Sequence, residues 1–266
     1  MHLILTGASG VIGTSILNYI VQHAIPAGIV TQLSILTRRP IPYLENTTSI
    51  PEIKVIKHTD FETYPPSLLA ELQDAQACIW SIGIQISEVP EPEYMKITRD
   101  YAVAAAKAFA GLNGGKGFTF VYVSGEGATH NPGAMTMRFA RLKGQAEKAV
   151  LAAGEQGGPE YAAGLRPLVV RPGGVDPFRD PVVMKAWAER KYGWKSMIYR
   201  PTVFSVFDMV YPSMVSDATE LGRCLTGIAT KEYGAEVKWQ GDYVEAEGRV
   251  LTNTALKRII KENLVP

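Results

Sequence analysis

Three glycines near the amino terminus are spaced as a phosphate-binding turn requires. Gly7, Gly10 and Gly13 lie in GASGVIG, between an apolar run that predicts a strand and an apolar pattern that predicts a helix over 11–24. Here the first glycine permits a tight turn, the second lets backbone approach a pyrophosphate, and the third lets the helix pack on the sheet. Amides at the helix N-terminus favour an anion. We therefore predict dinucleotide contacts from Gly7, Ser9, Gly10, Val11, Ile12 and Gly13.

The second predicted strand ends in two arginines, where a site for NAD usually carries a carboxylate. A guanidinium can bind a 2′-phosphate with two parallel donors, so Arg38 and Arg39 predict NADP as the cofactor, with NAD as the alternative. Asp60 and Phe61 follow the third predicted strand, and we expect them to contact the adenine.

Strand-like and helix-like patterns alternate along the chain as far as residue 175. This alternation predicts an α/β, Rossmann-type, doubly wound parallel sheet. Residues 1–266 are expected to form a single domain, in which 176–250 make most of a small C-terminal annex on the substrate side. The predicted strands are 3–7, 30–38, 53–58, 77–84, 117–125 and 164–175. The predicted helices are 11–24, 66–73, 91–112, 135–154 and 216–230.

The carboxyl ends of parallel strands meet at one edge of such a sheet, so the later strands should complete the cofactor site. The residues expected to do so are Ser81, Ile82 and Gly83 after the fourth strand, and Pro172, Gly173 and Val175 at the sixth.

Composition sets the outer bounds on function. The net charge of +1 argues against nucleic-acid binding driven by bulk charge. No window is long and apolar enough to cross a bilayer, and the N-terminus does not read as a signal peptide. Cys78 and Cys224 have no metal-ligand spacing, so we expect buried thiols and no metal site. These features predict a cytoplasmic protein with a small-molecule substrate, and they leave room for a homodimer.

Several motifs together resemble the atypical or extended branch of the short-chain dehydrogenase/reductase superfamily. They are TGASGVIG, the arginine after the second strand, DF at 60–61 and RPG at 171–173. Within that superfamily the chain most resembles the NmrA-like and Tat-interacting-protein-like members, through TRDYAVAAAKAFA, RLKGQAEKAV and GRVLTNTALKRI. The resemblance covers nearly the whole chain and implies a bound nicotinamide cofactor.

The resemblance also implies a Tyr-x-x-x-Lys pair beside the nicotinamide, on the helix after the fifth strand. In that family the lysine binds the ribose and lowers the pKa of the tyrosine, which exchanges the substrate proton, while a serine polarises the carbonyl. Lys143 matches the lysine, but Phe139 stands where the tyrosine would be. Ser124 is the candidate serine, although position 125, here a glycine, can equally be the family's position. A positioned general acid contributes about 10²- to 10⁴-fold, and His130 is the candidate replacement.

Three functions stay open. The favoured one is an NADP(H)-dependent oxidoreductase acting on a small apolar carbonyl or alcohol, with a proton donor other than tyrosine. The second is a non-redox isomerase, dehydratase or cyclase. Its apolar substrate would contact the aromatic residues Trp187, Trp194, Tyr199, Phe204 and Phe207. The third is a non-enzymatic NADP-binding redox sensor or regulator.

Overall fold

A computed structural model describes residues 1–45, 50–155, 164–188, 214–231 and 240–264. Its centre is an eight-stranded sheet in the order β3-β2-β1-β4-β5-β6-β10-β9, parallel except where β9 runs antiparallel to β10. The predicted α/β doubly wound fold is confirmed. The strands are β1 (His2–Thr6), β2 (Gln32–Thr37), β3 (Ile53–Lys57), β4 (Ala75–Trp80), β5 (Phe118–Val123), β6 (Leu165–Val170), β9 (Val244–Glu245) and β10 (Val250–Leu251).

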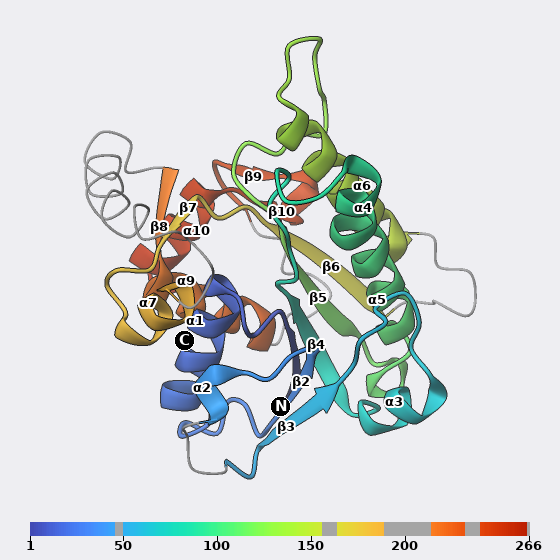
Figure 1. Cartoon of the computed structure of the whole chain (residues 1–266), viewed down its shortest axis with the longest axis vertical. Coiled ribbons are helices and arrows are strands. Elements are labelled where there is room, and N and C mark those ends of the chain that lie inside the picture. Colours follow the sequence, from blue (N-terminus) through green and yellow to red (C-terminus); the bar gives the residue numbers. More distant parts are fainter. Residues whose placement is uncertain (46–49, 156–163, 189–213, 232–239, 265–266) are drawn as a thin grey trace.

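Helices cover both faces of the sheet (Figure 1). One layer holds α3, α4, α5 and α6, and the other holds α1 and α9 with α2, α7 and α10 near them. The helices are α1 (Val11–Tyr19), α2 (Pro42–Glu45), α3 (Pro66–Glu71), α4 (Glu91–Met95), α5 (Tyr101–Phe109), α6 (Arg138–Glu155), α7 (Pro181–Ala188), α9 (Ala218–Thr230) and α10 (Asn253–Lys261).

The buried core forms one cluster on each side of the sheet. On the α1 side, β1, β2 and β4 meet α1, α9 and α10. On the other side, β4 and β5 meet α3, α5 and α6. Strands covered on both faces are nearly continuous in apolar residues, which explains why their sequence pattern was clear. Cys78 and Cys224 are both buried with free thiols, as expected.

Two predicted helices contain π-helical turns. The helix expected over 91–112 is α4 and α5 joined by a π segment at Lys96–Asp100, and α1 continues as a π segment at Ile20–Ala24. The helix expected from residue 135 begins at Arg138. A π turn depends on how the helix packs in the fold, and periodicity in a short window does not reveal it.

The strand predicted over 164–175 is divided in two. β6 ends at Val170, and β7 (Gly174–Asp176) leaves the main sheet to pair in parallel with β8 (Val215–Asp217). Pro172 has no amide hydrogen for a sheet ladder, which favours a break at this point.

Residues 176–250 contribute to the main fold as well as to its edge. The Ser15 hydroxyl of α1 donates to the carbonyl of Ala218 at the start of α9, so that these two helices pack together. β10 pairs with β6 at the end of the sheet. The annex stays a prediction, because Trp194, Tyr199, Phe204 and Phe207 lie outside the described residues.

Candidate active site

The turn between β1 and α1 is built around its glycines. Gly7 has φ +70°, and a β-carbon on it would lie 2.5 Å from the Ser81 carbonyl oxygen. A β-carbon on Gly13 would lie 2.1 Å from the Gly7 carbonyl oxygen. Gly10 is the N-cap of α1, and its amide donates to the Gly7 carbonyl at 2.8 Å. The first-turn amides of α1 therefore follow a narrow turn, the geometry that fits a pyrophosphate.

The end of β4 is tied to the glycine turn by polar contacts. The Ser81 hydroxyl donates to the Thr6 carbonyl at 2.6 Å, and the Ser81 amide donates to the Thr6 hydroxyl at 3.3 Å. Ile82 and Gly83 follow outside any regular element, and Gly83 borders open space. Ser81 and the glycine turn therefore share one edge of the sheet.

Arg38 and Arg39 follow β2 and are exposed. The Thr37 hydroxyl donates to the Arg39 carbonyl at 2.7 Å and accepts from the Arg39 amide at 3.2 Å, which fixes the backbone of the turn. No ion pair joins either guanidinium to a carboxylate in the described part of the chain. Both charges are thus available to an anion.

Asp60 and Phe61 take different positions after β3. The Asp60 carboxylate accepts from the Glu62 amide at 3.0 Å and from the Thr63 hydroxyl at 2.8 Å. These two bonds, the amide first, lower the pKa of the Asp60 carboxyl. The Phe61 ring lies in the core, edge-on to Trp80, so only its backbone is free to line an adenine site.

The catalytic candidates gather where α6 passes the end of β5. Phe139 and Lys143 are one turn apart on α6 and share a face. A β-carbon on Gly125 would lie 3.1 Å from Phe139 Cζ, so the ring tip packs over the residue that follows Ser124. Lys143 is buried, with Nζ 5.6 Å from the centre of the Tyr122 ring. The structure thus brings three predicted residues together.

The Ser124 hydroxyl is buried and makes no hydrogen bond of normal geometry with a described residue. It lies near enough to Glu147 to help lower the pKa of that carboxyl. A buried hydroxyl with free hydrogen-bonding capacity suits a polar partner from outside the chain.

His130 does not stand free in the site. Its Nε2 lies 2.7 Å from Oε2 of Glu147, one turn beyond Lys143 on α6. Arg171, at the end of β6, donates to the same carboxylate at 2.7, 3.0 and 3.2 Å, and it also donates to Glu245 at 2.8 Å. Neither Glu147 nor Arg171 was predicted to be a site residue, although Glu147 lies four residues after Lys143 in RLKGQAEKAV and Arg171 begins the RPG motif.

The Glu147 carboxylate is fully buried yet ionised. Burial raises the pKa of the carboxyl, but hydrogen bonds from His130 and Arg171, together with the charge of Arg171, outweigh that effect and lower it. A buried charge needs such partners.

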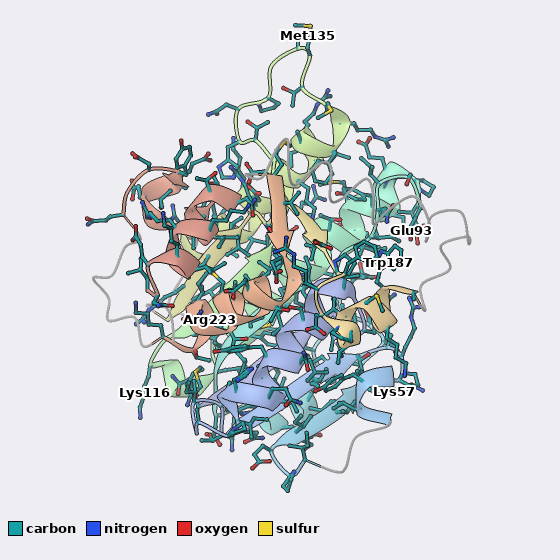
Figure 2. All side chains as sticks on the ribbon, turned by 90° about the vertical axis from the view of Figure 1, so that its left-hand side faces the viewer. Lys57, Glu93, Lys116, Met135, Trp187 and Arg223 are labelled. Carbon is teal, nitrogen blue, oxygen red and sulfur yellow. The ribbon has the colours of Figure 1, made fainter. Side chains whose placement is uncertain are left out.

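Gly144 allows the loop that carries His130 to lie on α6. A β-carbon on Gly144 would come 1.8 Å from the Thr129 carbonyl oxygen, so no larger residue fits without displacing that loop. The Thr129 amide donates to the Ala140 carbonyl at 3.1 Å. Farther along, the loop projects from the molecule, and Met135 lies at its outer end (Figure 2).

The loop after β6 is held by the C-terminal part of the chain. The Gly173 amide donates to the Ser216 hydroxyl at 3.1 Å, and that hydroxyl donates to the Asn253 side chain at 2.6 Å. Pro172 is buried, and Val175 lies within β7. Because β6 runs parallel to β1 through β4 and β5, the RPG loop lies at the edge that bears the glycine turn.

No protein-family model matches the chain. Leucinostatins biosynthesis cluster protein T of Purpureocillium lilacinum is 38% identical over 127 residues, which are 48% of this chain and 44% of that protein. Botcinic acid biosynthesis cluster B protein 16 of Botryotinia fuckeliana is 43% identical over 77 residues, which are 28% of this chain and 46% of that protein. The aligned regions span a little under half the length of each relative.

Solved structures share the fold at low sequence identity. A short-chain dehydrogenase/reductase from Saccharomyces cerevisiae is 14% identical, with a TM-score of 0.61 over 100% of this chain and 99% of that one. A dTDP-glucose 4,6-dehydratase from Streptomyces venezuelae, solved with NAD bound, is 13% identical, with a TM-score of 0.59 over 99% of this chain and 81% of that one. The architecture is therefore that of the short-chain dehydrogenase/reductase structures.

No helix in the described ranges has the length and apolarity needed to cross a membrane.

Proposed function

We propose that the chain is an NADP(H)-dependent oxidoreductase of the short-chain dehydrogenase/reductase superfamily. It belongs to the NmrA-like or Tat-interacting-protein-like subgroup and interconverts a small apolar carbonyl and its alcohol. The observation that carries this proposal is the meeting of Lys143, Phe139 and Ser124 at the sheet edge where the glycine turn lies. The charge of Lys143, the hydroxyl of Ser124 and the glycine turn that would bind the cofactor thus lie at the same edge of the sheet.

The cofactor would occupy that edge. First-turn amides of α1 would bind the pyrophosphate, Arg38 and Arg39 the 2′-phosphate, and Asp60 the adenine. Ser81, Ile82, Gly83 and the loop at Pro172–Gly173, with Val175 beyond it, would line the remainder. When bound, NADPH supplies the hydride that adds to a carbonyl carbon.

Lys143 and Ser124 would act on the substrate end of the site. The Ser124 hydroxyl would donate to the carbonyl oxygen, and the Lys143 ammonium would favour negative charge developing there. The Phe139 ring would pack against the reactants without exchanging a proton. A donor other than tyrosine, with His130 as the candidate from the sequence, would have to complete the reaction.

The two relatives support a role in making a natural product. Both are named for biosynthesis clusters, so we infer that this chain modifies an intermediate of such a pathway as a tailoring enzyme. We also propose a cytoplasmic location and a small-molecule partner, with a homodimer as a compatible assembly.

Phe139 favours a second candidate function. Without the phenol, the same scaffold could serve a non-redox isomerase, dehydratase or cyclase, or a redox sensor that binds NADP without turnover. In the non-redox enzyme the cofactor would be structural or absent, and in the sensor NADP would bind without any proton transfer.

A turnover assay separates the oxidoreductase from both alternatives. The protein would be incubated with NADPH and a series of apolar aldehydes, ketones and quinones, with Gly13→Ala as the control that lacks a cofactor cradle. We expect slow, carbonyl-dependent oxidation of NADPH that Gly13→Ala removes. Tight NADPH binding without any carbonyl-dependent oxidation would support the sensor or the non-redox enzyme instead.

A further inference from the structure

The Lys143 side chain is buried, and its amine makes no hydrogen bond or ion pair with any described residue. The residue is 7% exposed, and its Nζ lies over the face of the Tyr122 ring, 5.6 Å from the ring centre. A lysine side chain this buried normally has an anionic or carbonyl partner. Here the place one turn earlier on the same face belongs to Phe139, which offers no oxygen.

Among the described groups near the Lys143 amine, only Glu147 carries a charge. Tyr122 donates its hydroxyl to the Thr98 carbonyl at 2.9 Å, and burial raises the pKa of that phenol far above its usual range. Burial likewise raises the pKa of Tyr94, which lies on α4, close enough to Tyr122 to help raise the pKa of that phenol. Both phenols are therefore neutral. Glu147 is ionised, but His130 and Arg171 occupy its oxygens.

We propose that Lys143 itself donates the proton during carbonyl reduction, in the place that Phe139 leaves without a hydroxyl. Glu147 is then a positioning residue that supports the ammonium from one turn away. This inference rests on the proposed function. As hydride adds to the carbonyl carbon, the C=O π electrons take a proton from Lys143 Nζ. The products are an alcohol, NADP⁺ and a neutral amine, which water then reprotonates.

The structure favours Lys143 over His130 for two reasons. His130 Nε2 is already bound to Glu147, a full turn farther along α6, whereas Lys143 is adjacent to Phe139 on the shared face. Burial also lowers the pKa of Lys143 to about 8, against the opposing effect of the Glu147 charge. A general acid works best when its pKa is near the working pH.

Substitution at position 143 separates proton donation from cofactor binding. Arginine keeps the positive charge and several donors for the ribose, but it does not release its proton. We expect Lys143→Arg to hold NADPH within about tenfold of wild type while carbonyl reduction falls by about 10²- to 10⁴-fold. Lys143→Met should lose both. The exposed lysine on the same helix supplies the control, Lys148→Met, which should change neither.

The pH profile adds a readout that a purely structural role would not move. An acid that must be protonated gives a reduction rate that falls as pH rises through its pKa, so the rate should fall near pH 8. Glu147 raises the pKa of Lys143, so in Glu147→Gln the fall should occur at lower pH. Full activity in Lys143→Arg, together with loss of activity in His130→Gln, would overturn the proposal and assign the proton to His130.

Chemical labelling tests the amine without any turnover. Acetic anhydride would be applied across a pH series, followed by peptide mass spectrometry, with Lys148 measured in the same digests. We expect Lys143 to react with a midpoint near 8 and to be protected by NADP⁺. A midpoint near the ordinary lysine value of about 10.4, or no reaction at any pH, would contradict the proposal. If Lys143 titrates with a midpoint near 8 but the protein never oxidises NADPH, the proposed oxidoreductase function is wrong, whereas the lowered pKa of Lys143 is confirmed.

Discussion

The ring tip of Phe139 lies over Gly125, so close that a β-carbon at position 125 would be 3.1 Å from Cζ. A serine at position 125 would press on the ring, so the missing side chain at 125 and the ring at 139 suit one another. Cζ is the ring carbon that would carry the hydroxyl of a tyrosine. The contact with Gly125 places this carbon at the end of β5, beside Ser124.

Phe139→Tyr should raise NADPH-dependent carbonyl reduction. The change adds a hydroxyl on a face where Lys143 is already in place, and a general acid is worth about 10²- to 10⁴-fold when well positioned. We expect a gain toward the lower end, because the hydroxyl must find room beside Gly125. Steady-state rates would measure it. Lower native activity without any NADPH oxidation would indicate a non-redox enzyme.

Arg38→Ala should weaken NADPH binding by about tenfold or more, because a hydrogen bond to a charged group contributes roughly 1.5–3 kcal/mol. NADH lacks the 2′-phosphate, so its affinity should hardly change. Calorimetry with both cofactors measures the difference. Lys116→Ala, in the turn before β5 at the opposite edge of the sheet, is the control for general loss of positive charge (Figure 2). Equal losses for the two cofactors would remove the assignment of NADP.

Gly13→Ala should destabilise the fold and abolish NADPH binding. Alanine improves helix propensity by about 1 kcal/mol, but overpacking costs typically 1–3 kcal/mol. The clash is with backbone, since the new β-carbon would lie 2.1 Å from the Gly7 carbonyl oxygen, so we expect the cost to exceed the gain. Thermal unfolding and calorimetry would report both effects. Gly111→Ala, which meets nothing within 4 Å, is the matched control.

Because of Glu147, we expect the free energy of unfolding to fall at acid pH. Its folded-state pKa is lowered, so the carboxylate stabilises the fold above its ordinary value of about 4.3, and that contribution is lost as pH falls through the folded-state pKa. Breaking a buried pair costs about 3–5 kcal/mol, which sets the upper range for Glu147→Gln. Denaturant unfolding across pH should show a lower, flatter curve for Glu147→Gln and little change for the exposed Glu93→Gln. If the unfolding free energies of wild type and Glu147→Gln vary with pH in parallel, Glu147 is not the carboxylate with a lowered pKa that stabilises the fold.

Local patterns predicted the parts of the fold that depend on local chemistry. The glycine turn was predictable because the turn, the close approach and the helix start all act within seven residues. The strands were predictable because both faces of the sheet are covered. Parallel topology also predicted that the strand ends, and with them Ser81, Ser124 and Pro172, lie at one edge of the sheet.

Long-range contacts account for what the sequence did not reveal. The adenine contact of Asp60 and Phe61 stays a prediction, but the sequence did not reveal that the Phe61 ring packs edge-on to Trp80 in the same core cluster. Glu147 is an ordinary helical residue in the sequence, and only the fold brings Arg171 and His130 to it. The pairing of β10 with β6 likewise joins segments about eighty residues apart, which periodicity does not detect.

Tracing the hydride tests the central claim most directly. The full chain would be supplied with NADPH deuterated at the transferring position of C4, together with the series of apolar carbonyl compounds, and the products analysed by mass spectrometry. The account predicts an alcohol that carries one deuterium at the former carbonyl carbon, with none formed by Gly13→Ala. Bound NADPH that keeps its deuterium against every carbonyl compound would contradict the assignment as an oxidoreductase.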